Sequence, residues 1–202
     1  MEWIVVIALV AFVIYFLRSR RVPQVSLAYL PARFVVFDLE TTGLDPEKHE
    51  IIEIGAIRVN RDSINHDTFQ SLVKPSKKVP KKITELTGIN QSMLDTDGEP
   101  IESALRDFAS FVGDLQLVSF NADFDLAFLH NAAAKHSLAF TNPVSCALKM
   151  ARRAWPGRKS YRLVDLAKDG DLSSDGTHRA LGDCQRALIV YTAAASKLGT
   201  IR

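Results

Sequence analysis

Most of this chain consists of short apolar runs and of segments whose apolar residues recur at helical spacing. Runs rich in β-branched and aromatic residues predict strands over 34–39, 50–59, 64–73 and 115–120, with a fifth near 138–145. Apolar positions at helical spacing predict helices over 80–86, 100–112, 123–135, 146–154, 161–168 and 179–197. Strands that first follow one another and then alternate with helices predict an α/β domain, in which a mixed sheet is flanked by helices.

The N-terminus has a different pattern, an unbroken apolar run from Trp3 to Leu17 followed by Arg18-Ser19-Arg20-Arg21. This run is short for a membrane span, which usually needs about 20 residues, but Arg18 could snorkel to the interface. A cleavable signal peptide would have positive charge before the run, whereas Met1-Glu2 precedes it here. A buried core helix is the third reading. We predict an uncleaved transmembrane helix, with the arginine side in the cytoplasm.

This pattern divides the chain into three parts. We expect a transmembrane anchor over 1–17, a linker over 18–32 with two prolines, and one folded domain over 33–202. The domain is long enough to bury a full core. The predicted location is the inner (cytoplasmic) membrane, as a single-pass protein whose domain lies in the cytoplasm.

Composition adds little to this picture. The formal net charge is only +2, so long-range attraction of nucleic acid is weak, although lysines cluster over 74–82 and arginines over 152–162. Each cluster is either a phosphate-contact surface or an ordinary solvated surface. Two cysteines do not make a disulfide framework, which favours reduced thiols in a cytosolic environment.

The most informative polar residues are Asp38 and Glu40, which follow the apolar run Phe34-Val35-Val36-Phe37. Residues two apart on a strand point to the same face, so both carboxylates should emerge side by side. Two close negative charges repel unless a cation lies between them, and oxygen ligands favour Mg²⁺ or Mn²⁺. The spacing therefore suggests a metal-dependent phosphoryl-transfer site, although the same residues could simply end a strand in a turn.

Two later segments offer the missing ligands. The first runs from Ser119 to Leu129 and places Asp125 in the first turn of a predicted helix. The second, from His178 to Asp183, leads into the last predicted helix. Five residues correspond to about 140° around a helix, so these two side chains converge only if His178 precedes the helix and Asp183 lies one turn inside it.

These three blocks, in this order, resemble the DEDDh 3′→5′ exonucleases, the superfamily of the proofreading epsilon subunit of DNA polymerase III and ribonuclease T. The resemblance runs from about Arg33 to about Lys197 and includes the secondary segments 50–56, 83–89 and 151–163. It implies a ribonuclease H-like sheet. The histidine at 178 places the chain in the histidine branch of the family.

The resemblance also implies a role for each residue of the blocks. Asp38 would bridge two ions (Mg²⁺ or Mn²⁺), Glu40 and Asp183 would complete the ligands of the first, and Asp125 would hold the second, directly or through water. His178 would be the general base, since histidine changes charge near neutral pH. The family often has His-Asn where this chain has Phe120-Asn121. Substrate contacts are expected from the residues around the blocks, namely Thr41, Gly43, Leu44, Thr87, Phe120, Asn121 and Phe124.

The expected function is a two-metal 3′→5′ exonuclease that acts on single-stranded nucleic-acid ends, with DNA favoured over RNA. An RNA-trimming exoribonuclease and a non-catalytic nucleic-acid-binding membrane module are the alternatives. In the linker, Gln24-Val25-Ser26-Leu27-Ala28-Tyr29 resembles the peptide with which bacterial replication proteins bind the sliding clamp. The sequence leaves the oligomeric state open.

Overall fold

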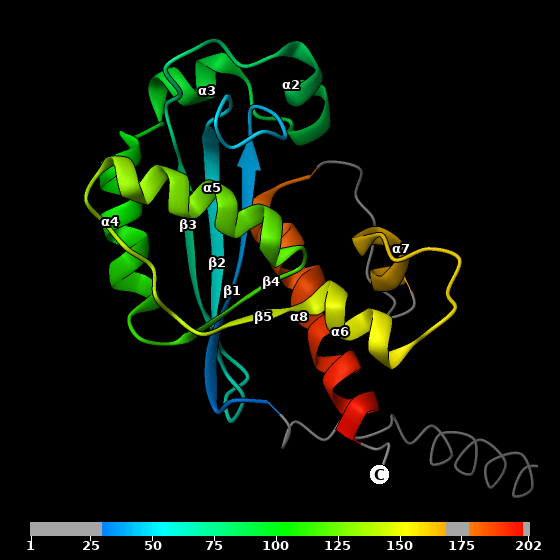
Figure 1. Ribbon diagram of the computed structural model, residues 1–202. Coiled ribbons are helices and arrows are strands. Elements are labelled where there is room, and N and C mark those ends of the chain that lie inside the picture. The colour runs from blue at the N-terminus through cyan, green and yellow to red at the C-terminus, as the bar shows by residue number, and fades with distance from the viewer. Residues whose placement is uncertain (1–29, 169–177, 200–202) are drawn as a thin grey trace, which may run out of the picture.

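The computed structural model describes residues 30–168 and 178–199 (Figure 1). Its strands are β1 (Arg33–Thr41), β2 (Ile51–Asn60), β3 (Asp67–Leu72), β4 (Gln116–Ser119) and β5 (Val144–Cys146). Its helices are α2 (Lys81–Thr87), α3 (Gln91–Thr96), α4 (Ile101–Val112), α5 (Ala122–Lys135), α6 (Ala147–Ala154), α7 (Leu163–Lys168) and α8 (Ala180–Gly199).

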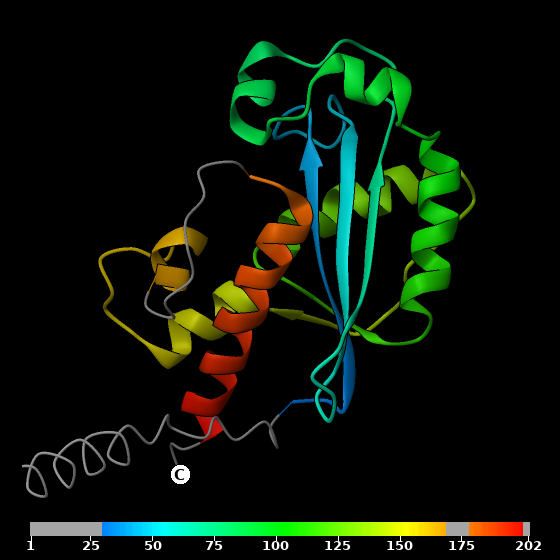
Figure 2. The same cartoon turned by 180° about the vertical axis from the view of Figure 1, so that it is seen from behind.

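The five strands form one mixed sheet in the order β3-β2-β1-β4-β5. β1 pairs antiparallel with β2 and parallel with β4, and β5 continues the parallel side. Helices cover both faces, with α4 and α5 on one side and α8 with α6 on the other (Figure 2). The predicted α/β class and mixed sheet are confirmed.

Strand β1 lies at the centre of the sheet and contributes to a core on each face. Val35, Phe37 and Leu39 pack into the cluster formed with α4 and α5. Phe34 and Val36 face the other way and pack with α8. Because side chains alternate along a strand, the next positions on the α8 side belong to Asp38 and Glu40.

Helix α8 presents a matching stripe to the sheet. Its buried residues recur at helical spacing, and Asp183 lies on this stripe beside Cys184 and Ala187. Three carboxylates thus occupy positions where the hydrophobic pattern of both elements would place apolar side chains. The two cysteines, Cys146 and Cys184, are free thiols.

Three elements differ from the sequence prediction. Helix α3 was not expected, because six residues are too few for a periodic pattern; Asn90 caps it by accepting from the Met93 N–H at 3.0 Å. β3 begins at Asp67 rather than 64, because a turn in which the Ser63 N–H donates to Asn60 O precedes it. β5 is confined to three residues, since Pro143 before it has no N–H to donate to a ladder.

The predicted anchor over 1–17 and nearly all of the predicted linker over 18–32 lie outside the described residues. Across 30–168 and 178–199, none of the helices combines the length and the apolar character that a membrane crossing requires.

Candidate active site

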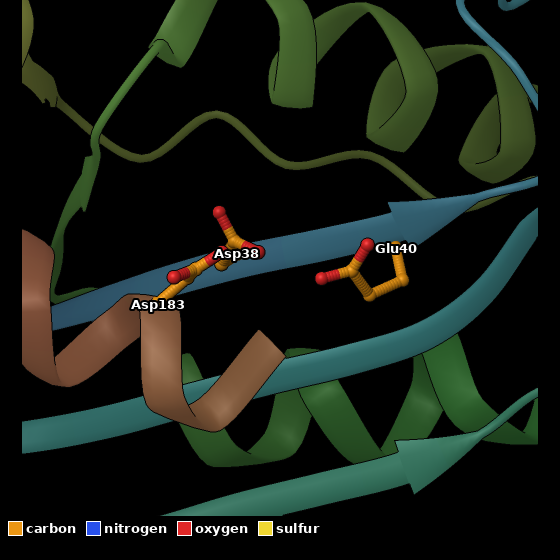
Figure 3. A group of neighbouring side chains, drawn as sticks. All are labelled: Asp38, Glu40 and Asp183. Carbon is orange, nitrogen blue, oxygen red and sulfur yellow. The ribbon is translucent and has the colours of Figure 1, made fainter. Parts of the chain in front are cut away.

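Three carboxylates converge where β1 meets the start of α8 (Figure 3). Asp38, Glu40 and Asp183 each offer one oxygen, and these atoms all lie within 4.8 Å of one another. Glu40 and Asp183 are buried, at 8% and 5% exposed, while Asp38 is partly exposed. The structure therefore brings together three of the four carboxylates predicted as metal ligands.

The protein does not neutralise the charge of this cluster fully. Burial, and then the charges of Asp125, Glu40, Asp183 and Glu53, raise the pKa of Asp38 well above its usual range. Burial, and then the charges of Asp183, Glu53 and Asp125, raise the pKa of Glu40 to about 8, and the opposing effect of the Arg179 guanidinium is smaller. Such a site favours either protons or an added cation.

Asp125, the fourth predicted ligand, borders the cluster but is held by protein groups. Its Oδ2 accepts from the Ser119 hydroxyl at 2.5 Å, and its Oδ1 accepts from the Leu39 N–H at 3.3 Å. Burial raises the pKa of Asp125 to about 7, although these hydrogen bonds oppose the shift. Because Leu39 follows Asp38 in β1, the bond to the Leu39 N–H holds the Asp125 carboxylate next to the cluster. Its role as ligand of a second ion stays a prediction.

His178 lies just before α8, where the five-residue spacing requires it. Its Nδ1 lies 3.0 Å from Asp183 Oδ2, and its backbone N–H donates to Leu86 O at 3.1 Å. The side chain is 41% exposed. Since Nδ1 faces a carboxylate, that nitrogen carries the proton and Nε2 is the nitrogen able to accept one.

Three partners of the predicted residues were not singled out from the sequence. Arg186 Nη1 donates to Asp183 Oδ1 at 2.6 Å, Ser119 holds Asp125, and the Leu86 carbonyl holds His178. The i, i+3 spacing of Asp183 and Arg186 on a helix was a readable signal. The other two contacts join segments far apart in the chain, which no local pattern reveals.

The predicted substrate loop after β1 is ordered by its own hydrogen bonds. The Thr41 hydroxyl donates to Gly43 O at 2.6 Å. A Cβ at Gly43 would lie 2.3 Å from the His49 ring, so any larger residue there would require that ring to move. The next side chain, Leu44, is 82% exposed. This loop presents an apolar side chain to solvent beside the end of the strand that carries the carboxylates.

The other predicted substrate residues are less uniform. Asn121 is exposed before α5, whereas Phe120 and Phe124 are partly buried against the cores. Thr87 is 1% exposed, and its hydroxyl donates to Ile83 O and accepts from the Ile89 N–H. The hydroxyl of Thr87 thus serves the end of α2, while its neighbour Leu86 is 48% exposed.

Comparison with known proteins agrees with this geometry. The model of the exonuclease family matches residues 35–191. The DNA polymerase III subunit epsilon of Aquifex aeolicus is 40% identical over 156 residues, which are 76% of each chain. The PolC-type DNA polymerase III of Caldanaerobacter subterraneus subsp. tengcongensis is 38% identical over 176 residues, 87% of this chain but only 12% of that protein.

A solved structure shows the same fold. The zinc-bound complex of Escherichia coli ExoI with single-stranded DNA matches with a TM-score of 0.71 at 19% identity. The match covers 85% of this chain and 41% of that one. A family match that covers most of the chain, and a relative of similar length at 40% identity, show that this chain belongs to the exonuclease family of phosphodiester hydrolases.

Proposed function

We propose that this protein removes nucleotides one at a time from the 3′ ends of single-stranded DNA, with divalent cations held by Asp38, Glu40 and Asp183. The observation that carries the proposal is the convergence of these three carboxylates within 4.8 Å beside a half-exposed histidine. The names of the relatives, a DNA polymerase subunit and an ExoI–single-stranded DNA complex, support DNA as the polymer.

The residues fit a divalent cation on chemical grounds. All three side chains donate oxygen, which suits Mg²⁺ or Mn²⁺ rather than a soft metal. The raised pKa values of Asp38 and Glu40 indicate that the carboxylates remain undercompensated by the protein's own charges. When bound, such ions supply Lewis-acid stabilisation of the negative charge that develops on the phosphate during hydrolysis.

The protein's own residues then position the nucleophile. His178 Nε2 accepts the proton of the attacking water, while Asp183 Oδ2 holds Nδ1 and stabilises the imidazolium that forms. The contact between the His178 N–H and Leu86 O fixes the backbone of this loop. The exposed Leu44 and Leu86 side chains are suited to pack against the terminal base, which would place the last phosphodiester at the carboxylates.

Direction and polymer are tested together on the full chain, purified in a mild detergent. The protein is incubated with Mn²⁺ and matched 5′-labelled single-stranded DNA and RNA oligonucleotides, and products are separated on a denaturing gel. A ladder that shortens from the 3′ end, faster on DNA and absent with Asp183→Asn, supports the proposal. Faster shortening of RNA would replace DNA by RNA as the substrate, and endonucleolytic products would contradict the proposed mechanism.

We further propose that residues 1–17 anchor the enzyme in the inner (cytoplasmic) membrane, with the catalytic domain in the cytoplasm. The apolar run and the arginines after it support this. Fractionation of cells that express the full chain tests it: retention in the membrane after carbonate washing is expected, and release would contradict it.

The linker peptide over 24–29, which also lies outside the described residues, is a separate proposal. Loss of sliding-clamp binding with Gln24→Ala and Leu27→Ala would support its role in clamp binding.

A further inference from the structure

Glu53 is a buried carboxylate that the reaction chemistry does not use. It lies on β2 directly opposite Glu40 of β1, and its side chain is 0% exposed. A charge removed from water at this depth is costly unless other groups compensate it. Its partners therefore reveal what the position does.

The Glu53 carboxylate binds the beginning of α8. Arg179 Nε lies 3.1 Å from both carboxylate oxygens, and Arg179 Nη2 lies 2.6 Å from Oε1. Oε2 also accepts from the Ala180 N–H at 3.0 Å, one of the amides that a helix start leaves unpaired. Gln70 of β3 donates to Oε1 at 2.8 Å. Glu53 thus joins the sheet to the first turn of the helix.

The strand and helix backbones also approach very closely here. A Cβ at Gly55 would lie 2.6 Å from Ala180 C and from Leu181 N. Gly55 pairs with Asp38 across the sheet, so the close approach occurs beside the first carboxylate of the cluster. A side chain at Gly55 would push the start of α8 away from the site.

Arg179 connects this contact to His178, which precedes α8, and to Asp183, which lies in its first turn. It follows His178 in the chain, and its carbonyl oxygen accepts from the Asp183 N–H at 2.9 Å. We propose that Glu53 and Arg179 form a positioning pair that fixes His178 and Asp183 relative to Asp38 and Glu40. This inference rests on the proposed function, because the site that the pair positions is the proposed exonuclease site.

Two variants of the full chain test the pair. Glu53→Gln keeps the size of the side chain and an oxygen for the Ala180 N–H but removes the charge that faces Arg179. Arg179→Ala removes the guanidinium from a side chain that is 36% exposed, which leaves room for a free guanidinium ion to enter. Each variant should lower kcat about 10- to 100-fold, as expected for a small displacement of catalytic groups, with KM within about 3-fold.

Chemical rescue separates positioning from simple loss of stability. Guanidinium chloride at low millimolar concentration should restore part of the kcat of Arg179→Ala, and equal NaCl should not. Arg106→Ala is the matched control, because Arg106 forms an exposed ion pair with Glu102 on α4, away from the site. It should keep its activity and show no response to guanidinium.

Each outcome decides between the two proposals. Wild-type kcat in folded Glu53→Gln, or a loss of activity equal to the fraction of unfolded protein, would overturn the positioning pair. A wild-type chain without nuclease activity would overturn the proposed function instead. In that case a calorimetric Mn²⁺ titration still tests the pair, since a displaced Asp183 should weaken Mn²⁺ binding in Glu53→Gln, and unchanged binding would count against it.

Discussion

Glu40 and Glu53 face each other on neighbouring strands, yet their carboxylates have opposite surroundings. Glu53 is enclosed by the Arg179 guanidinium, the Ala180 N–H and the Gln70 amide. Glu40 lies among other carboxylates, and its pKa is raised to about 8. The protein compensates the Glu53 carboxylate with its own donors, whereas the Glu40 carboxylate is surrounded mainly by groups of like charge. The difference shows how a fold can use the same residue type for structure and for chemistry within one pair of strands.

Among the variants considered, Asp38→Asn should have the largest effect, because it removes a carboxylate from the cluster around Glu40. Removal of one charge from the proposed ion-binding cluster should lower kcat/KM about 10³-fold or more, which corresponds to about 4 kcal/mol of transition-state stabilisation. The same change should raise the melting temperature in EDTA, because it relieves like-charge repulsion. Nuclease assays and thermal unfolding of the same sample check both effects. A variant that is both inactive and less stable in EDTA would contradict the description of this region.

His178→Ala should have the next largest effect. Loss of a general base typically costs about 10²- to 10⁴-fold in kcat. Mn²⁺ affinity should change far less than in Asp38→Asn, because His178 contacts Asp183 but is not one of the three converging side chains. Single-turnover rates and Mn²⁺ titration provide the two measurements. His130→Ala, an exposed histidine on α5, is the control and should match the wild type.

The pH dependence of stability should sharpen the comparison. Glu40 and Asp125 have folded-state pKa values raised to about 8 and about 7. A carboxyl group whose pKa is raised by folding stabilises the protein fully at a pH below its unfolded-state pKa. This stabilisation is lost as the pH rises through the folded-state pKa. The melting temperature in EDTA should therefore fall between pH 5 and pH 8.5.

Divalent cations should reverse this loss. Mn²⁺ should raise the melting temperature more at pH 8 than at pH 5, where protons compete for the carboxylates. Glu40→Gln should flatten the pH profile in EDTA, whereas Glu102→Gln on the exposed surface of α4 should leave it unchanged. A melting temperature in EDTA that rises over the same range would contradict the raised pKa values.

Ser119→Ala should produce the smallest of these effects. It removes the hydroxyl that donates to Asp125 Oδ2, a contact worth about 1–2 kcal/mol. We expect a lower melting temperature and a loss of activity of only a few-fold, since Asp125 retains the Leu39 N–H. Ser103→Ala, on the exposed side of α4, is the matched control. A loss as large as that of Asp38→Asn would mean that Asp125 has a more central role.

The sequence predicted the parts of this site that follow from local periodicity. Strand alternation placed Asp38 with Glu40, and helical geometry required His178 to precede the helix that carries Asp183; the structure agrees with both. Most strands and helices also begin and end within a few residues of their predicted bounds. These features depend on neighbours in the chain, which a single sequence reveals.

Features that depend on distant segments were not predictable in this way. The role of Glu53 requires knowledge that β2 lies beneath the start of α8, and Arg179 lies 126 residues away in the chain. The hydroxyl of Thr87 is a different case, because its partners, Ile83 and Ile89, lie only four and two residues away around the end of α2. Short segments such as α3 and β5 have too few residues for a periodic signal.

The most direct test of the central claim is the initial rate of 3′-nucleotide release from single-stranded DNA by chelator-treated full chain as Mn²⁺ is added back. The rate should be near zero in EDTA, rise with Mn²⁺ to saturation, and stay near zero at every concentration for Asp183→Asn. Equal rates with and without the cation, or a fully active Asp183→Asn, would show that the three converging carboxylates are not the reaction centre.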